Sequence, residues 1–250
     1  MSSSRGLGLG CARALAAEGA HVLMTGRSGD ALAKAAADIT AKGPGKADHV
    51  TADLTDKAAV DTLVRATEDV LGSVDILVNN TGGPPPGRMV DADPAVLAAQ
   101  FDTMVMNVVE MTARLLPGMR GRRWGRIITI GSSGVVQPIP NLGLSNAIRS
   151  ALVGWSKSLS NDVAADGVTV NMLLPGRIHT ARVDELDTSV AKKTGMSLEE
   201  TRKAAMAAIP AGRYGTVAEF GAVCAFLASE PCSYVTGSLI RCDGGAIKSV

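Results

Sequence analysis

The sequence is poor in cysteine, histidine and aromatic residues. Its 250 residues include four cysteines and three histidines, and aromatic residues make up 3% of the chain. Cys11, Cys224, Cys232 and Cys242 form no C-x-x-C pair, so the spacing typical of a zinc site or a disulfide framework is absent. We therefore expect free thiols, no bound metal and a reducing compartment, the cytoplasm.

An excess of charge and a long apolar run are also lacking. The formal net charge is +1, from 25 Lys and Arg against 24 Asp and Glu. Such a balance offers no basic face for nucleic acid. The sequence has no uninterrupted apolar run of about 18 residues, and no basic-then-apolar leader follows Met1. We expect a protein that neither spans a membrane nor is secreted.

Short β-branched runs alternate with Ala-rich helical stretches along the whole chain. This alternation is typical of βαβ units, and apolar strands without a polar face indicate helices on both sides of a parallel sheet. The sequence therefore predicts one α/β domain over 1–250, a Rossmann-type doubly wound parallel sheet. Expected strands cover 21–25, 48–52, 75–78, 126–130, 168–174 and 238–241. Expected helices cover 30–42, 56–71, 95–119 (more than one helix), 142–165 and 217–229.

Two segments fall outside this alternation. The polar, charged stretch 182–208 has helical patches and is expected to be a lid over a substrate. The Gly-rich turn at 4–8 would ordinarily follow a buried central strand, and the sequence has no residues for it. Without that strand its neighbours would hold unpaired backbone groups. We expect either that the natural protein begins upstream of Met1, which we favour, or that the chain is a shortened form of low stability.

Polar and glycine-rich motifs stand at the ends of the expected strands, where ligands bind in this topology. In the first, Ser4-Arg5-Gly6-Leu7-Gly8, the absence of side chains lets backbone N–H groups and a helix N-terminus approach a pyrophosphate. Alone, this motif is equally compatible with an ordinary loop. Its later companions are Asp53-Leu54, Asn79-Asn80-Thr81-Gly82, Gly131-Ser132-Ser133 and Pro175-Gly176-Arg177-Ile178-His179-Thr180.

In these ordered motifs the sequence resembles the short-chain dehydrogenase/reductase family, which includes bacterial 3-oxoacyl-acyl-carrier-protein reductases. The resemblance runs from Met1 to about Ala246 and includes the closing segments Tyr234-Val235-Thr236-Gly237 and Asp243-Gly244-Gly245. The family's Thr-Gly-x-x-x-Gly-x-Gly fingerprint aligns with 1–8, where Met1-Ser2 replaces its Thr-Gly. The resemblance implies a nicotinamide-dependent oxidoreductase, a carbonyl or alcohol substrate, and a homotetramer or homodimer.

The resemblance also implies roles along the cofactor. Asp53 would contact adenine and Asn79 the adenosine side, while Ile178 and Thr180 would contact the nicotinamide amide. The remaining members of the strand-end motifs, Leu54, Asn80, Thr81, Gly82, Pro175 and Gly176, complete the expected cofactor site. Two alternatives stay open: Asp53 as a cap ahead of Thr55, and Asn79-Asn80 as a turn that merely ends a strand.

The choice of cofactor follows from charge. An acidic residue after the strand at 21–25 would repel a 2′-phosphate, and the sequence has Arg27 there instead. Arg5 adds a second positive charge in the phosphate turn. We therefore expect NADP(H) in preference to NAD(H), with a solvated surface arginine as the alternative interpretation of Arg27.

The family's catalytic group is only partly present. The alignment places Ser132 and Asn107 at the family's Ser and Asn, but Ser145 stands where the Tyr belongs and Arg149 where the Lys belongs. An aliphatic hydroxyl is too weak an acid to replace a phenol, and a guanidinium remains charged and cannot relay a proton. His179 is a conceivable replacement acid, although a lone loop histidine is usually solvated.

Three hypotheses follow. In the first, the protein is a divergent reductase in which Ser132 and Arg149 stabilise an oxyanion and water or a substrate group supplies the proton. In the second, it binds NADP(H) without turnover as a sensor or structural subunit. In the third, Arg149 serves a different reaction on an anionic substrate.

Overall fold

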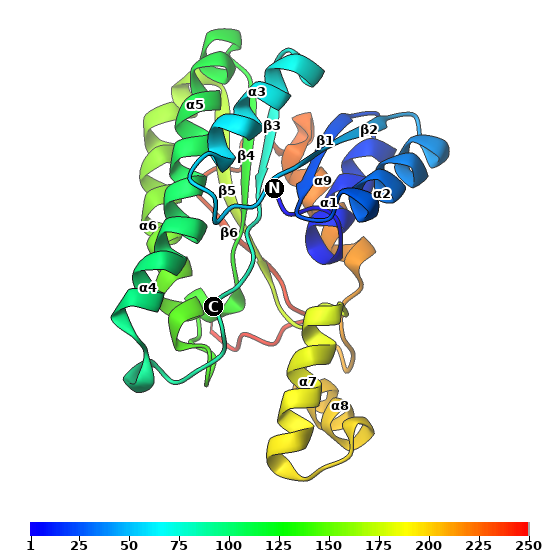
Figure 1. Ribbon diagram of the computed structural model, residues 1–250, viewed down its shortest axis with the longest axis vertical. Helices are drawn as coiled ribbons and strands as arrows, with labels where there is room; N and C mark the ends of the chain where they lie inside the picture. The colour runs from blue at the N-terminus through cyan, green and yellow to red at the C-terminus, as the bar shows by residue number, and fades with distance from the viewer. Residues whose placement is uncertain (250) are drawn as a thin grey trace.

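Parallel strands alternate with helices in the computed structural model, which describes residues 1–249 (Figure 1). The strands that it contains are β1 (His21–Gly26), β2 (Lys46–Thr51), β3 (Ile76–Asn79), β4 (Gly125–Ile130), β5 (Val168–Pro175) and β6 (Leu239–Cys242). The helices are α1 (Gly6–Ala17), α2 (Gly29–Lys42), α3 (Ala59–Leu71), α4 (Pro94–Phe101), α5 (Asn107–Arg122), α6 (Gly143–Val163), α7 (Ala181–Thr194), α8 (Leu198–Ala207) and α9 (Val217–Ala228).

The strands form two separate parallel sheets. One contains β1 and β2, and the other has the order β3-β4-β5-β6. Within residues 1–249, no strand is hydrogen-bonded between β1 and β3, so each of these two strands has one neighbour. Figure 1 shows β1 and β2 set apart from the four-stranded sheet, with the N-terminus between the two. The predicted Rossmann-like α/β fold is confirmed.

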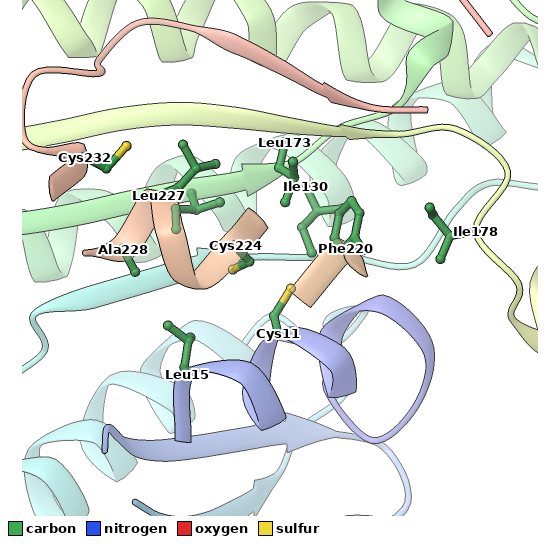
Figure 2. Close-up of a cluster of buried hydrophobic side chains, with 11 residues drawn as sticks. Cys11, Leu15, Ile130, Leu173, Ile178, Phe220, Cys224, Leu227, Ala228 and Cys232 are labelled. Carbon is green, nitrogen blue, oxygen red and sulfur yellow. The ribbon is translucent and has the colours of Figure 1, made fainter. Parts of the chain in front are cut away.

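Helices cover both faces of the strands. On one face α1 and α9 pack with β3, β4 and β5, and on the other α3, α5 and α6 pack against the same strands. Figure 2 shows the first of these clusters, in which Phe220 and Cys224 of α9 lie between Cys11 of α1 and Leu173 of β5. At the crossing of α1 and α9, a Cβ on Gly221 would come within 2.5 Å of the Gly10 carbonyl oxygen, so only glycine permits this approach.

The cysteines are free thiols, as predicted from their spacing. Cys11 and Cys224 face each other in the α1–α9 core, where their hydrogen bond and burial raise the pKa of the Cys224 thiol well above its ordinary value. None of the helices described in residues 1–249 is both long and apolar enough to cross a membrane.

The predicted strands and helices agree with the structure apart from their ends. The helix predicted from residue 56 begins at Ala59 instead, because the Asp56 carboxylate accepts a hydrogen bond from the Ala58 N–H (2.9 Å) and holds a turn. The stretch predicted as helical over 95–119 consists of α4, a π-helical turn at Asp102–Met106, and α5, which continues through Pro117 to Arg122. A π-helical turn has no characteristic amino-acid composition, so the sequence pattern does not distinguish it from the α-helices on either side.

Candidate active site

The Gly-rich turn enters α1 at the carboxyl ends of the strands. Arg5 is the N-cap residue and its side chain forms no capping hydrogen bond, and Gly6 has a positive φ of 58°. A Cβ on Gly6 would meet only the Thr180 methyl carbon, at 3.8 Å. The turn and the loop after β5 therefore face each other, as expected if both border one cofactor.

Asn80, the residue that follows β3, anchors this turn. Its Nδ2 donates to the Ser2 carbonyl oxygen at 2.9 Å, and a Cβ on Gly8 would lie against both groups. Glycine at position 8 is thus required by the contact between the turn and β3. The structure gives the Asn80 amide a positioning contact within the predicted cofactor site.

Two arginines lie exposed beside the turn. Arg27 follows β1, and Arg5 stands at the start of α1. The Ser3 N–H donates to the Thr25 carbonyl oxygen at 2.7 Å, which ties the turn to the end of β1. Neither arginine forms an ion pair with any residue between 1 and 249. Both guanidinium groups are therefore available to an anionic ligand.

The Asp53-Leu54 motif is held from two sides. Asp53 Oδ1 accepts hydrogen bonds from the Thr55 N–H (3.0 Å) and hydroxyl (2.9 Å). These bonds, with a weaker contribution from Arg27, lower the pKa of Asp53. The structure thus shows the capping contact that was the alternative interpretation. The predicted adenine contact stays a prediction.

Asn107 holds the other residue of that motif. Its Nδ2 donates to the Leu54 carbonyl oxygen at 2.6 Å. Asn107 is the first residue of α5 and follows the π-helical turn directly. The extra residue of a π-turn rotates the side chains after it. In this position Asn107 positions the loop after β2.

Arg149 is buried in α6 beneath the strand ends. Its Nη1 donates to the Ile130 carbonyl oxygen (3.0 Å) and its Nη2 to the Gly82 carbonyl oxygen (3.1 Å). Burial lowers the pKa of Arg149 to about 10, so the side chain is still a cation at neutral pH. The guanidinium therefore joins the end of β4 to the loop after β3 and places positive charge between them.

Ser132 and Asn146 lie on either side of Gly134, in the loop that follows β4. Ser132 Oγ accepts from the Gly134 N–H at 3.1 Å, which leaves its own proton free to donate. Asn146, next to Ser145 on α6, donates to the Ile139 carbonyl oxygen (3.0 Å) and accepts from the Ile139 N–H (3.3 Å). Ser132 thus caps the loop, and Ser145 lies in the first turn of α6.

The motif after β3 also makes a buried contact. Asn79 Nδ2 donates to the Thr112 hydroxyl of α5 at 3.2 Å, and the Thr81 hydroxyl contacts the Gly82 carbonyl oxygen at 3.2 Å. A Cβ on Gly82 or Gly83 would meet no atom within 4 Å. The loop therefore has open space beside it where the predicted cofactor would pass.

The loop after β5 is fixed to β6. The Gly176 N–H donates to the Cys242 carbonyl oxygen (2.9 Å), and a Cβ there would come within 2.6 Å of Asp243. Ile178 is buried and pairs with Gly215. Pro175 and Gly176 thus shape the loop, and Thr180 is the N-cap of α7 with no side-chain cap bond.

A buried carboxylate holds the charged segment 182–208 to this loop. Asp187 of α7 is fully buried, and it accepts hydrogen bonds from Arg177 and from the Tyr214 hydroxyl, the latter at 2.8 Å. His179 is 62% exposed and lies 3.3 Å from Asp184. Because the His179 ring is mostly exposed and lies beside a surface carboxylate, it is a solvated surface group. This argues against His179 as the replacement acid.

Four residues that position the site were not predicted from the sequence. Thr112, Asn146, Asp187 and Tyr214 each hold a predicted site segment through a contact 7 to 33 residues away in the chain. The Ser-Asn pair at the start of α6 was the available signal for Asn146, because Asn commonly bonds to loop backbone. The other three had no local signal.

The residues present fit an anionic dinucleotide. The open space beside Gly82 and Gly83, the gap between Gly6 and Thr180, and the exposed arginines lie along one edge of the strands. Backbone N–H groups at the start of α1 complete a site for phosphate.

Comparisons with known proteins agree with this geometry. The family model described as "Enoyl-(Acyl carrier protein) reductase" matches residues 1–246. The 3-oxoacyl-[acyl-carrier-protein] reductase FabG of Salmonella typhimurium is 33% identical over 245 residues, which is 97% of this chain and 93% of that protein. NADPH-dependent reductase BacG of Bacillus subtilis is 31% identical over 251 residues, covering 100% and 97% of the two chains.

Solved structures give the same result. The crystal structure of YwfH, an NADPH-dependent reductase involved in bacilysin biosynthesis, has a TM-score of 0.94 at 30% identity and covers 99% of this chain and 96% of that one. L-sorbose reductase from Gluconobacter frateurii, complexed with NADPH and L-sorbose, has a TM-score of 0.93 at 31% identity and covers 99% and 95%.

Proposed function

Because the chain belongs to the short-chain dehydrogenase/reductase family, we propose that it is an NADP(H)-dependent oxidoreductase that interconverts a small-molecule ketone or 3-oxoacyl compound and its alcohol. The observation that carries this proposal is the gathering of three features at one edge of the strands: the phosphate turn, Arg149, and two arginines that form no ion pair within residues 1–249. Relatives named for NADPH-dependent reduction support it.

NADP(H) fits this edge better than NAD(H). Arg27 and Arg5 supply two exposed cations beside the turn, and no carboxylate follows β1 directly. Guanidinium groups bind phosphate oxygens through charge-assisted hydrogen bonds. The 2′-phosphate is therefore held at Arg27, and the pyrophosphate at the N-terminus of α1. In this arrangement the whole chain, 1–250, is one NADP(H)-binding domain.

The catalytic group differs from the family's usual one. When bound, the reduced nicotinamide supplies a hydride to a carbonyl carbon, and the carbonyl oxygen becomes an alkoxide. Ser132 donates its free proton in a hydrogen bond to that oxygen, and the cationic Arg149 stabilises the developing charge. Ser145 lacks the tunable acidity of the phenol that usually stands at this position, so water or a group of the substrate itself supplies the proton to the alkoxide. Asn107 positions the adjoining loop through Leu54.

The substrate approaches beneath α7 and α8, which occupy nearly the whole of the expected lid at 182–208. Figure 1 shows both helices projecting beyond the sheet. Asp187, bonded to Arg177 and Tyr214, fixes the lid to the loop that carries Ile178 and Thr180. The homotetramer or homodimer implied by the family is part of the proposal, and sedimentation of the purified chain tests it.

A substrate panel tests the reaction. NADPH oxidation is followed at 340 nm with simple ketones, ketoses and 3-oxoacyl thioesters, on the unmodified protein and on Ser132→Ala. Loss of one oxyanion donor is expected to lower kcat by about 10²-fold and to leave the NADPH Kd unchanged. Ser133→Ala is the matched control, because its neighbouring hydroxyl has no role in the proposal. NADPH binding with no turnover across the panel would instead indicate a binding protein.

A further inference from the structure

Arg149 is a buried cation without a counter-charge. The residue is 9% exposed, and its guanidinium forms no ion pair with any carboxylate in residues 1–249. Burial is the one cause that shifts its pKa, so no neighbouring carboxylate compensates the positive charge. An ionised side chain is costly to bury, and buried charges in proteins are normally paired. Arg149 therefore places a cation at the strand edge that the described side chains do not neutralise.

Two other arginines show how this molecule ordinarily neutralises such a charge. Arg126 is buried, and its guanidinium lies 4.3 Å from the centre of the Trp124 ring and 3.7 Å from the Glu230 carboxylate. Arg177, half-buried in the loop after β5, is bonded to the fully buried carboxylate of Asp187. Arg149 has neither kind of partner in residues 1–249, which indicates that a ligand supplies its anion.

The guanidinium also keeps donors for that ligand. Of its five N–H groups, Arg149 uses one on the Ile130 carbonyl oxygen and one on the Gly82 carbonyl oxygen, so three remain. Its Nε has no acceptor within residues 1–249 and is not sealed from solvent. A neutral hydroxyl could accept from these groups but would leave the charge unbalanced. A carboxylate satisfies both the donors and the charge.

The side chain at position 145 leaves room for a ligand group beside the guanidinium. Ser145 lies four residues before Arg149 on α6, so the two share one face of the helix. Ser145 is half-buried and small, at the position where the family has a tyrosine. A ligand group can therefore approach the guanidinium over Ser145.

The cation and the proposed hydroxyl donor are close enough for one small molecule. The Ile130 carbonyl oxygen that holds Arg149 belongs to the residue two positions before Ser132. An extended backbone advances by at most about 3.6 Å per residue, so the two residues lie within about 7 Å of each other. Ser132 is the proposed donor to the substrate carbonyl oxygen. A carboxylate one or two carbons from that carbonyl would thus reach Arg149.

We propose that Arg149 determines the substrate class by binding the carboxylate of a 2-oxo or 3-oxo acid, while Ser132 binds its oxo group. This inference rests on the proposed function. The oxo acid gains a hydride from NADPH at its carbonyl carbon, and NADPH becomes NADP⁺. Because the carboxylate stays ionised against Arg149, the proton on the new hydroxyl comes from water. The carboxylate itself is unchanged in the reaction.

Paired acids and esters test the proposal on the unmodified protein. NADPH oxidation is followed with acetoacetate against methyl acetoacetate, and with phenylpyruvate against methyl phenylpyruvate. The kcat/KM of each acid is expected to exceed that of its ester by about 10- to 100-fold, the effect of one charge-assisted hydrogen bond. Esters reduced as well as the acids would overturn the carboxylate site and leave the proposed reductase function standing.

Two variants assign the preference to a residue. Arg149→Met removes the charge and keeps an extended side chain, and is expected to lower the acid-to-ester ratio to about one. Arg182→Gln is the control, because Arg182 is an exposed cation of α7 beside the same loop. Its ratio should equal that of the unmodified protein. A preference that survives in Arg149→Met, or an equal loss in Arg182→Gln, would overturn the proposal.

Binding without turnover separates this proposal from the proposed reaction. The same acids and esters are titrated into the complex with NADP⁺, which has no hydride to give, and the acids are expected to bind at least tenfold more tightly. Where nothing is reduced, the proposed reaction fails, and tighter acid binding that requires Arg149 still supports the carboxylate site. Equal binding of acid and ester would overturn it. The Tm and the NADP⁺ Kd establish that each variant is folded, and the comparison on the unmodified protein decides if Arg149→Met is not.

Discussion

The two sheets differ in how completely their strands are enclosed. All six residues of β4 are buried, whereas only one of the six in β2 is. The four-stranded sheet carries Ser132 and the loop that Arg149 holds, and the two-stranded sheet carries Arg27 and faces the phosphate turn. The reacting end of the proposed site thus rests on the enclosed sheet, and the adenosine end rests on the sheet with fewer neighbours.

Matched leucines give the largest expected difference between the two sheets. Leu173 of β5 is fully buried, and Leu23 of β1 is half-buried and lines a cavity between β1 and β3. Leu173→Ala is expected to lower the free energy of unfolding by about 3–4 kcal/mol, because a new cavity opens in a packed core. Leu23→Ala should cost about 1 kcal/mol, since its side chain already borders empty space. Urea denaturation measures both, and equal losses would contradict the comparison.

The second prediction restores the family's usual Tyr and Lys at positions 145 and 149, beside the enclosed four-stranded sheet. Ser145→Tyr with Arg149→Lys is expected to raise kcat for ketone reduction by about 10²-fold, because a phenol beside an ammonium supplies the missing general acid. The NADPH Kd should change little. Each single variant is a control: Tyr without Lys lacks the neighbouring ammonium, and Lys alone lacks the acid. No gain in the double variant would show that the site has been rebuilt around Arg149.

Removing the Arg27 side chain tests the cofactor contact proposed beside the two-stranded sheet. Arg27→Ala is expected to weaken NADPH binding by about tenfold, the effect of one charge-assisted hydrogen bond, and to leave NADH binding unchanged. Lys34→Ala, at an exposed position of α2, is the control for net charge. Isothermal titration measures both affinities. Unchanged NADPH affinity would show that Arg27 is a solvated surface residue, and an equal loss for both cofactors would show that Arg27 contacts a group that they share; in either case the 2′-phosphate is held elsewhere.

Much of the fold and part of the site follow from the sequence. Parallel strands all end at one edge, so motifs such as Asn79-Asn80 and Pro175-Gly176 could be placed together from their order alone. What each side chain bonds to could not. The bonds from Asn80 to Ser2 and from Asn107 to Leu54 join residues 78 and 53 positions apart. Local patterns contain no information about such pairs.

The Arg149 side chain shows the same limit. Its charge and its position on a helix face follow from the sequence, and so does the absence of a proton relay. That it is buried and bonded to the Ile130 and Gly82 carbonyl oxygens depends on where β4 and the loop after β3 end in space. A sequence motif therefore predicts which group stands at a site more reliably than what that group holds.

The smallest expected effect concerns Met1, whose nitrogen donates to the Val78 carbonyl oxygen of β3 at 2.9 Å, at the junction of the two sheets. Its ammonium pKa is lowered from 8.0 to about 6 in the folded chain. Between these values the unfolded chain binds more protons than the folded one, so stability rises with pH across this window. For a half-buried terminus we expect a gain of about 1 kcal/mol from pH 6 to pH 8.

Acetylation of the Met1 nitrogen is the control for that effect. The acetylated terminus has no ionisable proton in this range, and its N–H can still donate to Val78, so the dependence of stability on pH should flatten. The comparison uses protein shown by mass spectrometry to retain Met1, and measures urea denaturation at both pH values. An equal slope in the two forms would place the titrating group elsewhere, and the junction between the sheets would then be open enough to hydrate the ammonium.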